Sequence, residues 1–157
     1  METRNVLLIG YGNPGRGDDG LGPAFSEAMS ERGLAGLDVD TDYQLVAEHA
    51  LTVTDYDLVV FADAMMDTDQ PFRFERLASA RPETLGSHSL RPETVLALAD
   101  TLYGGAPEAW VLGISGYEFG EVHEGLSDSA TANLEAAKAF FLSWYEETIG
   151  RPVSAHA

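Results

Sequence analysis

A glycine-rich turn between a buried strand and a helix constrains the fold of this chain more than any other segment. The run Asn5-Val-Leu-Leu-Ile-Gly10 is apolar between its ends, as in a strand that is buried on both faces. The turn Tyr11–Gly20 follows it, and from Leu21 onward apolar residues recur at helical spacing. A strand, a glycine-rich turn and a helix in this order are typical of the start of an α/β fold, which places its binding sites at the carboxyl ends of its strands.

Strand-like and helical segments then alternate along the rest of the sequence. Four further strands are predicted at Leu37–Asp42, Leu58–Ala62, Pro71–Leu77 and Ala109–Ile114. Helices are predicted from Leu21 to Gly33, over Gln44–Thr54, from Pro92 to Gly104, and after Ser127, which is expected to cap the last one. The pattern predicts an α/β single-domain three-layer sandwich, with a mostly parallel twisted sheet of about five strands and helices on both faces. Right-handed crossovers predict that the sheet starts with the strand order 2-1-3, and Pro71–Leu77 is expected at an edge.

Length and composition set the class of protein. A chain of 157 residues is long enough for one domain with a substantial core. We expect the core to span residues 5–148, with a frayed tail at 149–157. The sequence has no cysteine, which excludes disulfides and thiolate metal sites. We expect a cytoplasmic monomer, since no signal peptide and no apolar run of membrane-spanning length is visible.

The net charge narrows the choice of partners. The chain has 26 acidic residues against 9 basic ones, which gives a formal net charge of −17. Nucleic acids and anionic membranes attract positive proteins, so neither is expected as a partner. An acidic surface suits a partner with a basic segment, or it serves solubility alone.

Three carboxylates follow two strands that the fold places side by side. Asp18 and Asp19 end the glycine-rich turn, and Asp63 closes the strand Leu58–Ala62. In the order 2-1-3 these strands are neighbours, and their carboxyl ends flank the crevice in which ligands bind. We expect Asp18 to cap the first helix and Asp19 to face the crevice, with Gly10, Gly12 and Gly15 turning the chain tightly. The alternative for Asp63 is that of a turn former at the end of a strand.

The turn also matches a dinucleotide-binding pattern. Gly10 to Gly15 satisfies G-x-G-x-x-G after a strand, and Asp40 or Asp42 suits the ribose-binding position after the next strand. The helix, however, does not open at the third glycine, and two carboxylates next to a pyrophosphate would repel it. A nucleotide-binding α/β protein therefore stays an alternative.

The four histidines differ in their surroundings. The start of an H-E-x-x-H zinc motif at His123 is not completed, because Ser127 stands where the second histidine belongs. His123 is expected in a loop, and His49 and His156 are expected to be solvated. His88 lies in a serine-flanked loop before the Pro92 helix. With Asp19 and Asp63 it makes a ligand set that suits a first-row divalent ion, and the alternative is an exposed or capping histidine.

The motifs together resemble those of a known family. Gly10-Tyr-Gly-Asn13, Gly17-Asp-Asp-Gly20, Phe61-Ala-Asp-Ala64 and Ser87-His88 are similar to the motifs of the NiFe-hydrogenase maturation endopeptidases, over about residues 5–148. The resemblance implies a twisted sheet between helices. It implies an endopeptidase that removes the C-terminal extension of a hydrogenase large-subunit precursor after nickel insertion. Nickel in the precursor is then the recognition signal, contacted by Asp19, Asp63 and His88.

One segment departs from the common family pattern. Many members have an Asp-Gly-Gly-Thr-like box after the second strand, linked to substrate selection. Here the position is Asp42-Tyr-Gln-Leu45. This resembles the branch that serves soluble, NAD-linked bidirectional hydrogenases, in which a Gln-Leu pair stands there. A non-catalytic, metal-dependent binding module on the same scaffold is a further alternative.

Overall fold

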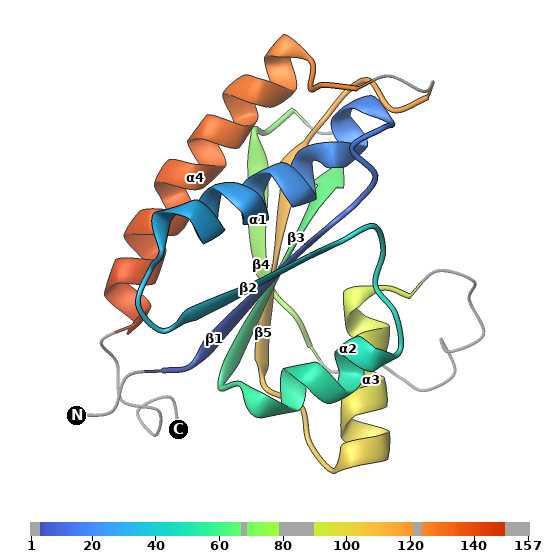
Figure 1. Cartoon of the computed structure of the whole chain (residues 1–157), viewed down its shortest axis with the longest axis vertical. Coiled ribbons are helices and arrows are strands. Elements are labelled where there is room, and N and C mark those ends of the chain that lie inside the picture. Colours follow the sequence, from blue (N-terminus) through green and yellow to red (C-terminus); the bar gives the residue numbers. More distant parts are fainter. Residues whose placement is uncertain (1–3, 67–68, 79–89, 121–123, 150–157) are drawn as a thin grey trace.

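One twisted sheet of five strands forms the middle layer of the structure (Figure 1). The computed structural model describes residues 4–66, 69–78, 90–120 and 124–149. The strands follow one another in space in the order β2-β1-β3-β5-β4. Their bounds are Val6–Tyr11 (β1), Leu37–Asp42 (β2), Leu58–Met65 (β3), Phe72–Arg76 (β4) and Glu108–Ser115 (β5). The predicted fold class and the order 2-1-3 are both confirmed.

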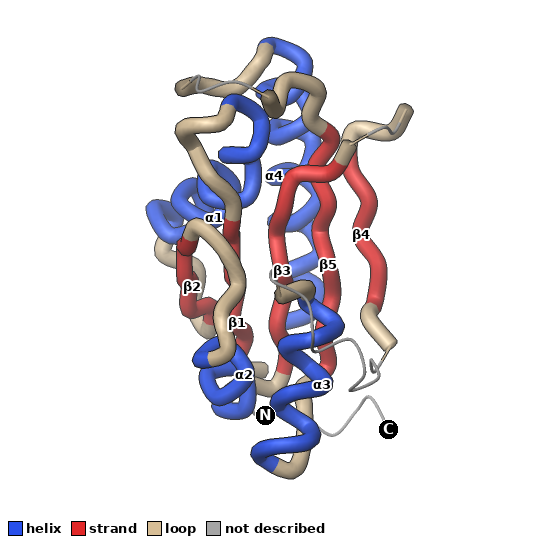
Figure 2. The backbone as a smooth tube through the Cα atoms, turned by 90° about the vertical axis from the view of Figure 1, so that its right-hand side faces the viewer, coloured by secondary structure: helices blue, strands red, loops and turns tan. Residues whose placement is uncertain are grey.

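Four helices cover the two faces of this sheet. They are α1 (Leu21–Arg32), α2 (Glu48–Thr52), α3 (Pro92–Tyr103) and α4 (Asp128–Ile149), with short 3₁₀ turns at η1 (Gly17–Gly20) and η2 (Val53–Asp55). The helices α1 and α4 lie on one face, and α2 and α3 lie on the other (Figures 1 and 2). None of the helices in the described part of the chain combines the length and apolar character that a membrane span needs.

The strand register brings three carboxyl ends to one edge. Strand β1 pairs in parallel with β2 and β3, so that Val6 lies opposite Leu37 on one side and Leu58 on the other. The pairing of β1 with β3 ends at Gly10 and Ala62. Strand β3 is longer than predicted and continues to Met65, because its far side stays paired with β5. Strand β4 is the antiparallel edge strand that the alternation in Pro71–Leu77 predicted.

One hydrophobic core lies on each face of the sheet. Alternate residues of β1 face opposite layers, because successive side chains of a strand point to opposite faces. Val6 and Leu8 pack with α1 and α4, while Leu7 and Ile9 pack with α2 and α3. This explains why the strand needs an unbroken apolar run. On the α1–α4 side, the fully buried rings of Phe25 and Phe141 meet edge to face at 5.3 Å.

Helix α1 approaches the sheet through glycine. A Cβ on Gly22 would lie 2.3 Å from the carbonyl oxygen of Tyr11 and 2.6 Å from that of Ala62. A Cβ on Gly10 would likewise lie 2.3 Å from Oγ of Ser26 on α1. Since no side chain fits between these backbones, the helix lies directly on β1 and β3. Gly10 therefore serves close packing rather than the tight turn that its sequence position predicted.

We expect Gly22→Ala to destabilise the protein strongly. The added methyl would meet backbone carbonyls of β1 and β3. Overpacking typically lowers the free energy of unfolding by about 1–3 kcal/mol, and we expect the upper end here because the clash is with backbone. Gly105→Ala is the matched control, because a Cβ there meets nothing within 4 Å and should change stability by less than about 1 kcal/mol. Urea unfolding of both variants checks this, and equal midpoints would contradict it.

Candidate active site

A cleft opens where the carboxyl ends of β1, β2 and β3 meet. Its volume is about 390 Å³, and it lies at the predicted switch point between β1 and β3. Five segments contribute to it: the end of β1, the 3₁₀ turn η1, the loop after β2, the end of β3 and the start of α3. The lining residues are Tyr11, Gly12, Asp19, Tyr43, Gln44, Leu45, Asp63, Leu90, Arg91 and Pro92. Two of the three predicted site residues, Asp19 and Asp63, therefore share one cleft.

Asp63 lies on β3 one residue beyond the end of its pairing with β1. The strands diverge there, and the half-buried carboxylate faces the cleft. Burial raises the pKa of Asp63 from 3.8 to about 6, against the lowering effect of hydrogen bonds from the Ala64 amide and the Tyr11 hydroxyl. The nearby charge of Asp19 raises the pKa further, and Arg91 lowers it. A carboxylate with a pKa near neutrality is suited to accept a proton during catalysis.

Asp19 reaches the cleft from the turn η1. Its Oδ2 accepts a 2.7 Å hydrogen bond from the amide of Asn13, which fixes the carboxylate to the glycine-rich loop. Gly12 makes this approach possible: its φ is +144°, and a Cβ there would lie 2.1 Å from the carbonyl oxygen of Asp19. Only glycine fits such a position readily. The predicted turning role thus holds for Gly12.

Asp18 does not cap α1, contrary to the prediction. The N-cap of α1 is Gly20, and no side chain bonds there. The fully buried Asp18 carboxylate instead accepts hydrogen bonds from the amides of Tyr117, Glu118 and Ser127, and from the Ser127 hydroxyl, at 2.7–3.0 Å. Burial alone raises the pKa of Asp18, but these bonds outweigh it and hold the pKa below its usual value. The carboxylate joins the turn after β1 to the segment after β5.

The same contact reaches the last helix. Ser127, which donates its hydroxyl to Asp18, accepts a hydrogen bond from the amide of Ala130 in the first turn of α4. The prediction that Ser127 caps this helix is therefore confirmed. The adjacent aspartates of the sequence motif thus divide into one buried structural residue and one cleft residue.

Two amides of the glycine-rich loop are hydrogen-bonded to side chains of the protein itself. The amide of Asn13 bonds Asp19, and the amide of Gly15 bonds the side-chain oxygen of Asn13 at 2.9 Å. Helix α1 begins only at Leu21, after the intervening turn η1. A dinucleotide loop uses such amides and the helix N-terminus for phosphate. This geometry disfavours the nucleotide-binding alternative.

Two cleft residues were not predicted from the sequence. Tyr11 is the last residue of β1, and its hydroxyl bonds Asp63; burial and that carboxylate raise the pKa of Tyr11 well above its usual range. Arg91 precedes Pro92 and is a cation that lines the cleft. Both adjoin motifs singled out in the sequence. Their roles depend on which strand end and helix start come together, and local patterns do not contain that information.

The predicted ligand His88 lies outside the described residues, as do His123 and His156. The segment that follows His88 in the sequence, Leu90–Pro92, lines the cleft. Geometry thus places Asp19 and Asp63 in this cleft, and the role of His88 stays a prediction.

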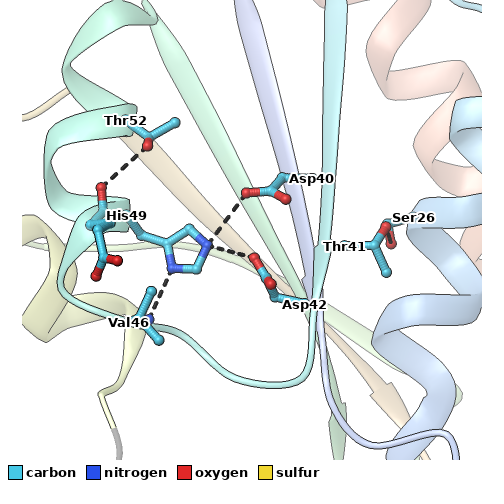
Figure 3. Close-up of polar contacts among 8 residues, drawn as sticks. Ser26, Asp40, Thr41, Asp42, Val46, His49 and Thr52 are labelled. Carbon is cyan, nitrogen blue, oxygen red and sulfur yellow. Dashed lines mark hydrogen bonds and ion pairs between the residues drawn. The ribbon is translucent and has the colours of Figure 1, made fainter.

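His49 is buried, which corrects the prediction that it is solvated. It is 3% exposed, and its Nε2 lies 3.0 Å from Oδ2 of Asp42 and 3.4 Å from Oδ2 of Asp40 (Figure 3). Its Nδ1 lies 2.9 Å from the amide nitrogen of Val46. Helix α2 begins at Glu48 rather than near Gln44. The residues that precede it, Tyr43, Gln44 and Leu45, line the cleft.

Comparison with known proteins shows which solved structures have a similar fold. No family model and no curated protein matches the sequence. Among solved structures, the hydrogenase maturating endopeptidase HybD from E. coli is 22% identical, with 94% of this chain and 93% of that chain covered and a TM-score of 0.67. The NiFe-hydrogenase maturation protease HycI from Thermococcus kodakarensis KOD1 is 19% identical, with 92% and 94% covered and a TM-score of 0.70.

A third structure gives the same result. The hydrogenase 2 maturation peptidase from Thaumarchaeota archaeon SCGC_AB-539-E09 is 22% identical, with 90% of this chain and 97% of that chain covered and a TM-score of 0.65. The chain therefore has the fold of the hydrogenase maturation proteases over nearly its whole length. At this level of identity the likeness establishes the fold, and it agrees with the resemblance of the motifs.

The same substitution should destabilise the protein strongly at Asp18 and only slightly at the adjacent Asp19. Asp18→Asn places an amide N–H among four hydrogen-bond donors, and should lower the free energy of unfolding by about 3 kcal/mol or more. Asp19→Asn retains an oxygen for the Asn13 amide and should change stability by less than about 1 kcal/mol. Denaturant unfolding at pH 7 compares the two. Similar losses in both variants would refute the assigned division of roles.

Asp63→Asn should gain stability relative to the wild type as the pH rises. The folded-state pKa of about 6 exceeds the ordinary value of 3.8, so the folded protein retains a proton that the unfolded chain releases between these values. Charged Asp63 therefore destabilises the fold increasingly above pH 4, and asparagine does not. From pH 5 to 7.5 the difference should shift by about 1.4 kcal/mol in favour of the variant. Urea unfolding at both pH values measures it, and a constant difference would be inconsistent with the raised pKa.

Proposed function

We propose that this protein is an endopeptidase that removes the C-terminal extension of a NiFe-hydrogenase large-subunit precursor after nickel insertion. One observation carries the proposal: Asp19 and Asp63, from neighbouring strand ends, line the same cleft in the fold of the hydrogenase maturation proteases. The proposal includes a monomer that acts in the cytoplasm.

Nickel belongs to the substrate in this proposal. Asp19, Asp63 and His88 offer two carboxylates and an imidazole, which suit a first-row divalent ion that keeps other positions open. A precursor with nickel in place completes the coordination, and an empty precursor does not. Binding energy from this contact holds the scissile peptide in position, so that only the metallated precursor is cleaved.

Two routes to peptide cleavage fit this cleft. In one, the carboxylate of Asp63 takes a proton from water, the water oxygen bonds to the peptide carbonyl carbon, and the amine leaves with that proton as the C–N bond breaks. The raised pKa of Asp63 supports this role. In the other, the nickel of the precursor polarises the carbonyl or the water. The Tyr11 hydroxyl orients the Asp63 carboxylate in both.

The loop after β2 is the proposed selector of the precursor. Tyr43, Gln44 and Leu45 line the cleft at the position that the motif resemblance links to substrate selection. Tyr43 is 74% exposed and Leu45 is 3% exposed, so the loop offers an accessible ring above a fixed apolar base. We assign this loop to a precursor of the soluble, NAD-linked bidirectional type.

The decisive experiment is mass spectrometry of a purified large-subunit precursor, with and without nickel, after incubation with the protein. We expect release of a C-terminal peptide only from the nickel-loaded form. Asp19→Ala, Asp63→Asn and His88→Ala should each lower the rate by about 100-fold or more. Asp100→Asn, an exposed carboxylate on α3, is the matched control and should cleave at the wild-type rate.

The other functions predict different results. A non-catalytic binding module would bind the nickel-loaded precursor and leave its C-terminus intact. A nucleotide-binding protein would show a thermal shift with NAD or FAD. Cleavage by the Asp19 and His88 variants at the wild-type rate would refute the proposed site, even if the wild-type protein is a protease.

A further inference from the structure

The cluster of Asp40, Asp42 and His49 has the outward form of a second metal site. One ligand atom from each residue lies within 4.8 Å of the others. Asp40 and Asp42 extend from β2 toward α2, while Thr41 between them points to Ser26 of α1 (Figure 3). Two carboxylates and an imidazole are a common ligand set for divalent ions. The question is which nitrogen of His49 is free to bind one.

The tautomer of His49 is unsuited to metal binding. A backbone N–H is always a donor, so Nδ1 of His49 must accept the hydrogen bond from Val46. A neutral imidazole holds one proton, which is therefore on Nε2, the nitrogen that faces Asp42 and Asp40. Metal-ligating histidines have the opposite arrangement, in which the metal takes a lone pair and the other nitrogen donates a proton. Nε2 is a donor here and has no lone pair to offer.

We infer that His49 is a positioning residue for the cleft wall formed by Tyr43, Gln44 and Leu45. Its Nε2–H donates to Asp42, the last residue of β2, and its Nδ1 accepts from Val46, the residue after the wall. One buried ring thus holds both ends of the wall. The amide of His49 also donates to the carbonyl of Val46 at 3.0 Å, which closes the turn a second time.

The contact extends to the glycine-rich loop. The carbonyl of Asp42 accepts a 3.1 Å hydrogen bond from the amide of Gly12, beside the loop that holds Asp19. His49 touches none of the cleft space itself, since it is absent from the residues that line the cleft. It therefore acts through Asp42 and Val46. The role in precursor binding rests on the proposed function; the role in holding the wall does not.

Hydrogen exchange of the Val46 amide in the free protein tests whether His49 holds the wall. We expect His49→Ala to accelerate exchange of this amide at least tenfold, because its acceptor is lost. His49→Asn keeps an oxygen at the place of Nδ1 and should retain the protection. Thr52→Ala, on the same helix, removes only a bond from its hydroxyl to the Glu48 carbonyl and is the matched control. Unchanged protection in His49→Ala would overturn the inference.

Cleavage of nickel-loaded precursor tests the functional half. His49→Ala should raise KM about tenfold and leave kcat within about twofold, because the wall binds the precursor and does not react with it. His49→Asn retains the bond to Val46 and loses the bond to Asp42, so its KM should lie between those of the wild type and of His49→Ala. A wild-type KM in His49→Ala, with Val46 released, would overturn the role in binding.

Two further outcomes separate the hypotheses. If the wild-type protein cleaves no precursor, the proposed function fails, and the Val46 exchange still decides whether His49 holds the wall. Calorimetric titration of the free protein with Ni²⁺ or Zn²⁺ addresses the metal alternative. Binding that is lost in His49→Ala and retained in Asp19→Ala would show a metal site and overturn the inference.

Discussion

The buried carboxylate of Asp18 is the contact on which the geometry of the cleft depends. It accepts hydrogen bonds from the amides of Tyr117, Glu118 and Ser127, and so joins the turn after β1 to the segments after β5 and before α4. The backbone amide of Asp18 adds a 2.8 Å bond to the Glu118 carbonyl. A buried charge is tolerated only when it is hydrogen-bonded, so these donors and the carboxylate require one another. With Asp18 fixed, the adjacent Asp19 lines the cleft, and the Asn13 amide holds its carboxylate there.

The close contact between the backbone of α1 and the backbones of β1 and β3 also fixes this edge of the sheet. Gly10 and Gly22 let α1 lie directly on β1 and β3, which sets the height of Tyr11 and Asp63 relative to the turn η1. The carboxylates of Asp19 and Asp63 are consequently near enough for one charge to raise the pKa of the other. Like charges held together by a rigid frame are a common feature of catalytic and metal-contacting sites.

The cleft wall at Tyr43–Leu45 is held by the hydrogen bonds of one buried histidine. His49 is buried among polar groups that fix its tautomer, and it bridges Asp42 and Val46 without entering the cleft. The cleft thus has a charged wall, built around Asp19 and Asp63, and a wall of exposed and apolar side chains at Tyr43–Leu45. The proposed function assigns the metal of the precursor to the first of these walls and its polypeptide to the second.

The sequence by itself determined the layers, the order of the first three strands and two cleft carboxylates, because these follow from local periodicity and from the handedness of parallel crossovers. The apolar run before Gly10 predicted a strand buried on both faces, and the motif around Asp63 predicted a group at the carboxyl edge. Only the tertiary structure decided that Asp18 bonds the segment after β5 and does not cap α1, that His49 is buried, and that Tyr11 and Arg91 line the cleft. The contacts of Asp18 and Tyr11 join residues that lie far apart in the sequence, such as Asp18 and Ser127, and no local pattern records which of them meet. The partners of His49 are near in sequence, but only the packed fold buries its ring.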